Sequence, residues 1–228
     1  MPRKDRTGDR KSRRQVAYKR IPKMGYYLIV TDTEKTERCF FDGFRNSLPN
    51  EAQDKLVIKV FETKTVEMIH KCDKLIEECE ERAAYDAQYR IPWIIFDRDE
   101  VEHFDELIEK AGNKNIHVGW SNPCFEIWLF AYFGQMPTVG NSTQCCKQFS
   151  LCYKKEIGLK YSKSDEKMYQ HLIKKGDENR AIMIAEKKHH ECLKNNYSKP
   201  SQMSPCTTVY ELVSEIKGKI DNIGLTEK

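Results

Sequence analysis

Acidic side chains follow two apolar segments of the chain, at the point where each segment ends. Asp32 comes just after the apolar run 25–30, and Asp97 and Asp99 lie near the end of the segment 91–100, IPWIIFDRDE. Carboxylates held at close range repel one another and raise one another's pKa values, whereas a hard divalent cation prefers such oxygen ligands. If the two segments end side by side, the three carboxylates predict a site for Mg²⁺ or Mn²⁺.

The hydrophobic pattern predicts the elements that would bring these ends together. Short apolar runs alternate with stretches of helical spacing, which predicts strands at 25–30, 54–62, 91–100 and 115–121 and helices at 33–48, 65–89 and 101–112. Such alternation is typical of a parallel α/β sheet with right-handed crossovers. Ligands of these sheets bind beyond the carboxyl ends of the strands, which is where the three aspartates fall.

The pattern changes after residue 121. Helical patterns cover roughly 141–157, 164–195 and 205–220, and the C-terminal half reads as entirely helical. We therefore predict a flexible basic arm at 1–23, an α/β core at 24–121, and a helical lobe at 122–228 that packs on the core.

Aspartates at strand-to-helix turns have a second interpretation, because Asp often caps helices. Asp99 followed by Glu102 resembles a capping box, Asp97 is a further capping candidate, and Thr33 is a plausible N-cap of the first helix. Capping and metal binding both stay open at these positions.

Glu126 is the only charged residue between Ser121 and Cys146, within a segment that is apolar nearly all round. A buried carboxylate without a partner costs several kcal/mol or takes up a proton. Its partner would be an arginine, a helix N-terminal amide or the metal site. A functional role and a structural ion pair are both consistent with the sequence.

The charge is distributed unevenly. The net charge is +4, but residues 1–23 hold ten basic residues against two acidic ones, a local charge of +8 that leaves −4 on the remainder. Such an arm can neutralise nucleic-acid phosphates, and we assign this role to Arg10, Lys11, Arg13 and Arg14. A solvated tail without a partner is the alternative.

Other patterns narrow the class of protein. No apolar run approaches the roughly 20 residues that span a bilayer, and the N-terminus lacks the apolar core of a signal peptide, so we expect a cytoplasmic protein with reduced cysteines and no membrane partner. No Walker A loop occurs. His189, His190 and Cys192 are too close along one helix to converge on a metal.

Four motifs together resemble the RloB (AbiLii-like) family of Toprim-fold proteins from bacterial defence loci. They are TDTEKTE (31–37), IIFDRDE (94–100), SNPCFEIWLFAYF (121–133) and SPCTTVYELV (204–213). The resemblance covers about residues 24 to 220. One departure stands out: the family pattern has Glu-Gly where this chain has Asp32-Thr33, a shorter acid followed by a residue without glycine's conformational freedom.

The resemblance implies a Toprim-like parallel sheet core that holds Mg²⁺ or Mn²⁺ for phosphodiester chemistry. Carried over to this chain, it implies metal ligation by Asp32, Asp97 and Asp99 and a further acid at Glu37 or Glu34; Glu126 remains a catalytic candidate on the residue pattern alone. Lys35 would offset phosphate charge.

The activity implied is that of a metal-dependent nuclease that cleaves RNA such as tRNA, or DNA, as an antiphage effector of abortive infection. The alternative is a non-catalytic nucleic-acid-binding or sensor subunit. Either would belong with an ABC- or AAA-type ATPase from the same defence locus, and a homo-oligomer is expected by analogy.

Overall fold

The computed structural model describes residues 24–32, 35–53, 56–82, 90–99 and 101–226. The predicted basic arm at 1–23, with Arg10, Lys11, Arg13 and Arg14, lies outside the described residues, as do Thr33 and Glu34. Among the described residues, no helix has the length and apolar character needed to cross a membrane.

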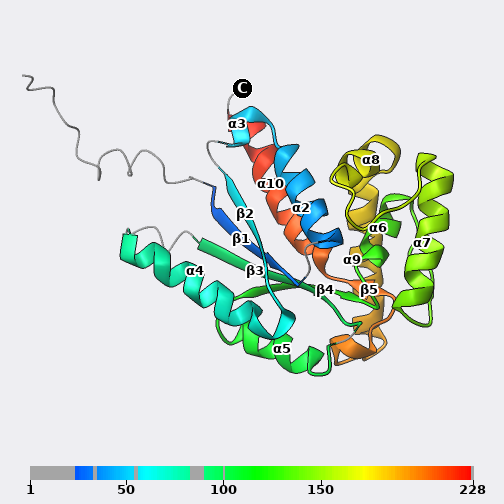
Figure 1. The fold of residues 1–228 in the computed structure, drawn as a ribbon, viewed down its shortest axis with the longest axis horizontal. Coiled ribbons are helices and arrows are strands. Elements are labelled where there is room, and N and C mark those ends of the chain that lie inside the picture. Colours follow the sequence, from blue (N-terminus) through cyan, green and yellow to red (C-terminus); the bar gives the residue numbers. More distant parts are fainter. Residues whose placement is uncertain (1–23, 33–34, 54–55, 83–89, 100, 227–228) are drawn as a thin grey trace, which may run out of the picture.

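A five-stranded sheet forms the centre of the fold (Figure 1). Its order is β2 (Val57–Glu62), β1 (Tyr26–Thr31), β3 (Arg90–Asp97), β4 (His117–Asn122) and β5 (Cys206–Thr207). The first four strands are parallel and β5 is antiparallel to β4. The mixed α/β fold with a mostly parallel, Toprim-like sheet is therefore confirmed. The register pairs Thr31 with Ile95, so β1 and β3 end close to one another.

Helices cover both faces of the sheet, which explains why its central strands are apolar on both sides. One face carries α2 (Thr36–Asn46) and α10 (Val209–Thr226), and the other carries α4 (Met68–Arg82) and α5 (Phe104–Gly112) (Figure 1). Alternate side chains of β1 serve the two layers: Ile29 packs in the core beneath α2, and Val30 packs in the core beneath α4 and α5. Two short helices, α3 (Asn50–Gln53) and η1 (Thr65–Glu67), flank β2.

The remaining helices gather at the end of the sheet where β1, β3 and β4 finish (Figure 1). They are α6 (Glu126–Tyr132), α7 (Ser142–Ile157), α8 (Met168–Lys175), α9 (Glu178–Lys194) and η3 (Pro200–Gln202). Every residue of α6 is buried. The apolar segment around Glu126 is thus the buried centre of this helical group.

Aromatic rings join α6 to α2. The ring of Phe40 lies 5.5 Å from that of Phe125, 6.3 Å from Trp128 and 6.2 Å from Tyr132, each edge to face. Such contacts combine a large buried area with a preferred geometry. They hold α2 against α6, and hence Glu37, near the start of α2, relative to Glu126, at the start of α6.

Two details of the C-terminal half correct the sequence prediction. It is not entirely helical, because β5 adds a strand beside β4. The predicted helix 164–195 is two helices, α8 and α9, separated at Gly176. A side chain at Gly176 would come within 2.9 Å of the Leu172 carbonyl and 2.8 Å of the Tyr132 carbonyl, so the chain turns there against α6. The boundary between an α/β core and a helical lobe at residue 121 stays a prediction.

Candidate metal centre

Asp32 directly follows β1, and Asp97 is the last residue of the neighbouring parallel strand β3. The Asp32 amide donates a hydrogen bond to the Ile95 carbonyl at 3.3 Å, and the backbone amide of Asp97 donates to the Asp32 carboxylate. The backbone amide of Phe125, just before α6, donates in turn to the Asp97 carboxylate. Three segments that are remote in the sequence are thereby tied together at this edge of the sheet.

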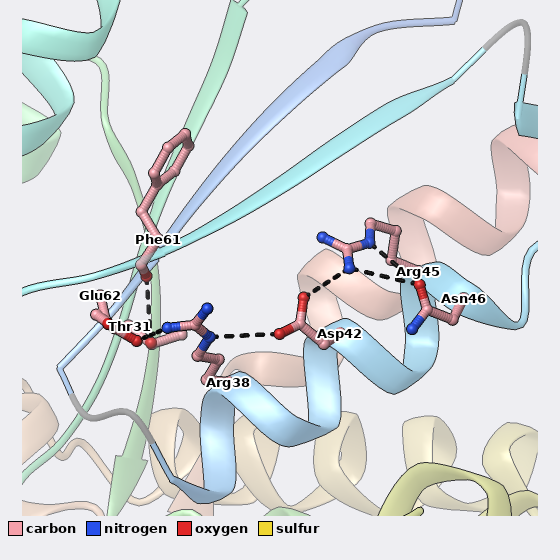
Figure 2. A network of polar contacts seen from close by, with 7 residues as sticks. All are labelled: Thr31, Arg38, Asp42, Arg45, Asn46, Phe61 and Glu62. Carbon is pink, nitrogen blue, oxygen red and sulfur yellow. Dashed lines mark hydrogen bonds and ion pairs between the residues drawn. The ribbon is translucent and has the colours of Figure 1, made fainter. Parts of the chain in front are cut away.

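Glu37 enters the site from the first turn of α2. Its side chain is only 3 % exposed, and its charge acts on both Asp32 and Asp97. The next residue, Arg38, points the other way: Figure 2 shows its guanidinium between Glu62, at the end of β2, and Asp42, one helical turn on. The buried side chains of Phe40, Phe41 and Phe44 orient α2 toward the core, and Glu37 is buried with them, whereas Arg38 is partly exposed.

Arg38 belongs to a larger network on the outer face of α2. Asp42 also binds Arg45, with 2.9 Å between its Oδ1 and the arginine Nη2 (Figure 2). Thr31 joins β1 to β2 beside this network, since its hydroxyl donates to the Phe61 carbonyl at 3.3 Å. The charges in this network are balanced, in contrast to those on the inner face of the helix.

Glu126 is the first residue of α6 and is 1 % exposed. Its Oε1 accepts a hydrogen bond from the Tyr161 hydroxyl at 2.9 Å and lies 3.3 Å from the Lys163 ammonium. Both partners come from the segment between α7 and α8. The predicted partner of Glu126 is therefore not an arginine: a lysine and a tyrosine together satisfy its Oε1 atom.

The two aspartates have raised pKa values. Burial is the largest cause at Asp97, whose pKa lies well above its usual range, and the negative charges of Glu37, Asp32 and Glu126 raise it further. Burial, and then the charge of Glu37, raises the pKa of Asp32 to about 7. Burial would also raise the pKa of Glu126, but Lys163 and nearby hydrogen-bond donors hold it below its usual value.

One oxygen of each of these three carboxylates is buried without a hydrogen-bond partner among the described residues. These atoms are Asp32 Oδ1, Asp97 Oδ1 and Glu126 Oε2. Most buried polar atoms in folded proteins are hydrogen-bonded, and leaving one unpaired costs roughly 1–3 kcal/mol, more for a charged group. Three unpaired carboxylate oxygens at one sheet edge are the arrangement that a hard cation would satisfy. These oxygens are candidate ligands for a divalent cation, although among the described residues no three of these acids place ligand oxygens within 4.8 Å of one another.

Asp99 has a different environment. It is exposed, and its Oδ1 accepts a hydrogen bond from the Ser142 hydroxyl at the start of α7. The capping interpretation of this turn is wrong, because α5 begins only at Phe104, with His103 at its N-cap and no side-chain hydrogen bond there. Asp99 instead connects the turn after β3 to the helices at the end of the sheet.

The structure thus brings together four predicted site residues: Asp32, Glu37, Asp97 and Glu126. Lys35 lies exposed at the N-cap of α2. Between the two candidate acids of the first turn, Glu37 is in the site and Glu34 lies outside the described residues.

Sequence reasoning missed Tyr161 and Lys163. They belong to the segment KYSKSDE, which reads as a polar connector and carries no periodic signal of its own. Ser142 was also missed, because it lies within the predicted helical segment 141–157 and nothing in the sequence links it to Asp99.

The fold and the site define a mostly parallel α/β protein with buried carboxylate oxygens at the carboxyl ends of β1 and β3. The family model of RloB-like proteins matches residues 27–216, and this chain belongs to the RloB-like family. No curated protein and no solved structure matches the chain.

Proposed function

We propose that the protein is a divalent-cation-dependent nuclease that hydrolyses phosphodiester bonds in nucleic acid, RNA such as tRNA or DNA, as an antiphage defence effector. The observation that carries the proposal is the set of buried, unpaired oxygens on Asp32, Asp97 and Glu126. Membership of the RloB-like family is consistent with it.

Asp32, Asp97, Glu37 and Glu126 would hold Mg²⁺ or Mn²⁺, with Asp99 beside them at the exposed rim. A cation bound there would polarise the scissile phosphate and lower the pKa of the attacking water. The chain supports such a site with fixed carboxylates, since backbone amides orient Asp32 and Asp97 before any ligand arrives. Positioning of this kind contributes directly to catalysis.

Other side chains would act on the substrate itself. Glu37 would accept a hydrogen bond from the attacking water and so orient it. The side chain of Lys163 is 49 % exposed, and its ammonium can donate to a phosphate oxygen while it holds Glu126. Lys35, exposed at the start of α2, would offset phosphate charge in the same way.

A cavity of about 540 Å³ lies between η1 and the start of α5. It is lined by Lys64, Lys110, His103 and Glu102 together with apolar side chains such as Val66 and Val101. The two lysines and the apolar side chains suit a nucleotide, whose phosphate and base need different surroundings. We propose that nucleotides flanking the cleaved bond lie here.

The second candidate function is a non-catalytic nucleic-acid-binding or sensor subunit of an ATPase-containing defence complex. The ion pair between Glu126 and Lys163 favours it, because the chain supplies a cation of its own at the site. Nucleic-acid binding by the arm at 1–23, an ABC- or AAA-type ATPase partner, a homo-oligomer and a cytoplasmic location stay predictions under either function.

Cleavage assays test the proposal. Purified full-length protein is incubated with labelled tRNA, bulk RNA and plasmid DNA in Mg²⁺, Mn²⁺ or EDTA. We expect cleavage of at least one substrate with metal and none in EDTA. Asp97→Asn should reduce it by more than about a hundredfold, since even residues that support metal ligands contribute 10–100-fold.

Asp221→Asn is the matched control, because Asp221 is an exposed aspartate on α10. It should cut at the wild-type rate. Cutting that survives Asp97→Asn would contradict the proposed site. Retention of nucleic acid by the wild-type protein without any cutting would support the second candidate instead.

A further inference from the structure

A second group of potential metal ligands lies beside Glu126. The Sγ atoms of Cys124 and Cys146 and a carboxylate oxygen of Glu126 all lie within 4.8 Å of one another. Cys124 and Glu126 come from the junction of β4 and α6, whereas Cys146 comes from the first half of α7. The group therefore exists only because α6 and α7 pack together.

The geometry suits a tetrahedral ion with sulfur ligands. Zinc binds thiolates at about 2.3 Å, and the tetrahedral angle then places two such sulfurs about 3.8 Å apart. The sulfurs of Cys124 and Cys146 are 4.0 Å apart. A shift of a few tenths of an ångström would bring both to bonding distance, and rotation about one side-chain bond supplies it.

The local backbone holds these ligands in place. Asn141 caps α7, its side chain accepting a hydrogen bond from the Gln144 amide at 2.9 Å, which fixes the turn that carries Cys146. Cys124 is 2 % exposed, whereas Cys146 is half-buried. The group thus has a rigid inner ligand and an outer ligand through which an ion can enter.

The charges also balance. Two thiolates and the Glu126 carboxylate carry three negative charges, and a divalent ion together with the Lys163 ammonium, 3.3 Å from Glu126 Oε1, would neutralise them. Soft thiolate ligands select zinc over Mg²⁺, which the oxygen-rich group at Asp32 and Asp97 suits better. The two groups therefore call for different metals.

We propose that Cys124, Cys146 and Glu126 bind one Zn²⁺ ion, with water as its fourth ligand. This site adjoins the carboxylate group through Glu126, whose charge also acts on Asp97. Zinc there would fix the start of α6 to α7. The proposal does not rest on the proposed nuclease activity.

Metal binding by reduced, full-length protein tests this proposal. Zinc is removed with a chelator, and Co²⁺ and then Zn²⁺ are added in the presence of a phosphine reductant. We expect one Co²⁺ per chain with thiolate-to-cobalt charge-transfer absorption, which stoichiometric Zn²⁺ abolishes. The absorption distinguishes this site from the carboxylate group, which offers no sulfur.

Cys146→Ser is the variant of choice, since Cys146 is half-buried and serine fits its place. It should reduce the charge-transfer absorption by at least half, because only the Cys124 sulfur remains, and weaken Zn²⁺ binding at least tenfold, a loss of about the size seen when metal sites are disturbed. Cys152→Ser is the matched control, because Cys152 is another half-buried cysteine of α7, and it should retain both. Absence of the band in the wild type, or its full intensity in Cys146→Ser with an unchanged circular dichroism spectrum, would overturn the proposal.

Discussion

Glu178 and Asp97 are both carboxylates enclosed by the protein, but their surroundings differ. Glu178 Oε2 accepts hydrogen bonds from the hydroxyls of Tyr132 at 2.7 Å and Tyr169 at 2.9 Å, and its Oε1 lies 2.7 Å from the Lys217 ammonium. Asp97 has an unpaired buried oxygen.

The charges around the two acids differ in sign as well. The negative charges of Glu37, Asp32 and Glu126 raise the pKa of Asp97, on top of the effect of burial. Glu178 has a cation beside it instead. Burial alone therefore does not separate a structural acid from a functional one; the separation comes from whether the protein itself satisfies the charge.

The difference should appear most strongly as opposite effects on stability. Glu178→Gln leaves Lys217 without its anion and gives the two tyrosine hydroxyls a poorer acceptor, so we expect a loss of about 2 kcal/mol, or roughly 4–8 °C in Tm. Asp97→Asn removes a buried carboxyl whose charge is opposed by burial and by the neighbouring negative charges of Glu37, Asp32 and Glu126, and we expect Tm in EDTA to rise by a similar amount. Thermal unfolding at neutral pH measures both.

Addition of Mg²⁺ sharpens the same comparison. A ligand that binds only the folded state raises Tm, so Mg²⁺ should stabilise the wild type and Glu178→Gln but have little effect on Asp97→Asn. If Asp97→Asn instead lowered Tm in EDTA as Glu178→Gln does, Asp97 would be a structural acid too.

The pH dependence of stability is the next largest effect. The pKa of Asp32 rises from 3.8 to about 7 on folding. Between these values the folded chain holds a proton that the unfolded chain has released, so stability falls as pH rises across this window and levels off above it. In EDTA we expect this group to lower Tm by about 4 °C between pH 5 and pH 8.

Asp32→Asn provides the comparison for that measurement, because it removes the titrating group and should flatten the slope. Saturating Mg²⁺ should oppose the trend in the wild type, since the cation binds the ionised carboxylates. An identical slope in wild type and variant would show that Asp32 titrates normally.

Removal of Lys163 should leave Glu126 without its cation. Because Glu126 is 1 % exposed, Lys163→Gln leaves a buried carboxylate supported mainly by the Tyr161 hydroxyl, and we expect a loss in EDTA of about 1–2 kcal/mol, or roughly 4 °C in Tm. The rise in Tm on adding Mg²⁺ should grow, because the variant presents more uncompensated negative charge to the metal. Lys160→Gln, an exposed lysine three residues away, is the control and should match the wild type in both measurements.

Much of the candidate site could be predicted from the sequence because it depends on local features. A continuous apolar run such as 26–31 predicts a buried strand. The residue that follows a parallel strand then lies at the carboxyl edge of the sheet. Glu126 was identifiable because a lone charge in an apolar helix needs a partner. Even the choice between capping and another role at Asp99 could be posed, although it could not be decided.

The sequence by itself determined the α/β class, the edge of the sheet where Asp32 and Asp97 lie, and the family to which the chain belongs. Only the tertiary structure decided that Glu37 faces inward, that Lys163 and Tyr161 hold Glu126, and that Cys124 meets Cys146. Periodicity records which face of an element is buried, because side-chain direction repeats along a helix or strand. Periodicity does not record which distant segment covers the buried face, because that depends on how whole helices pack against one another.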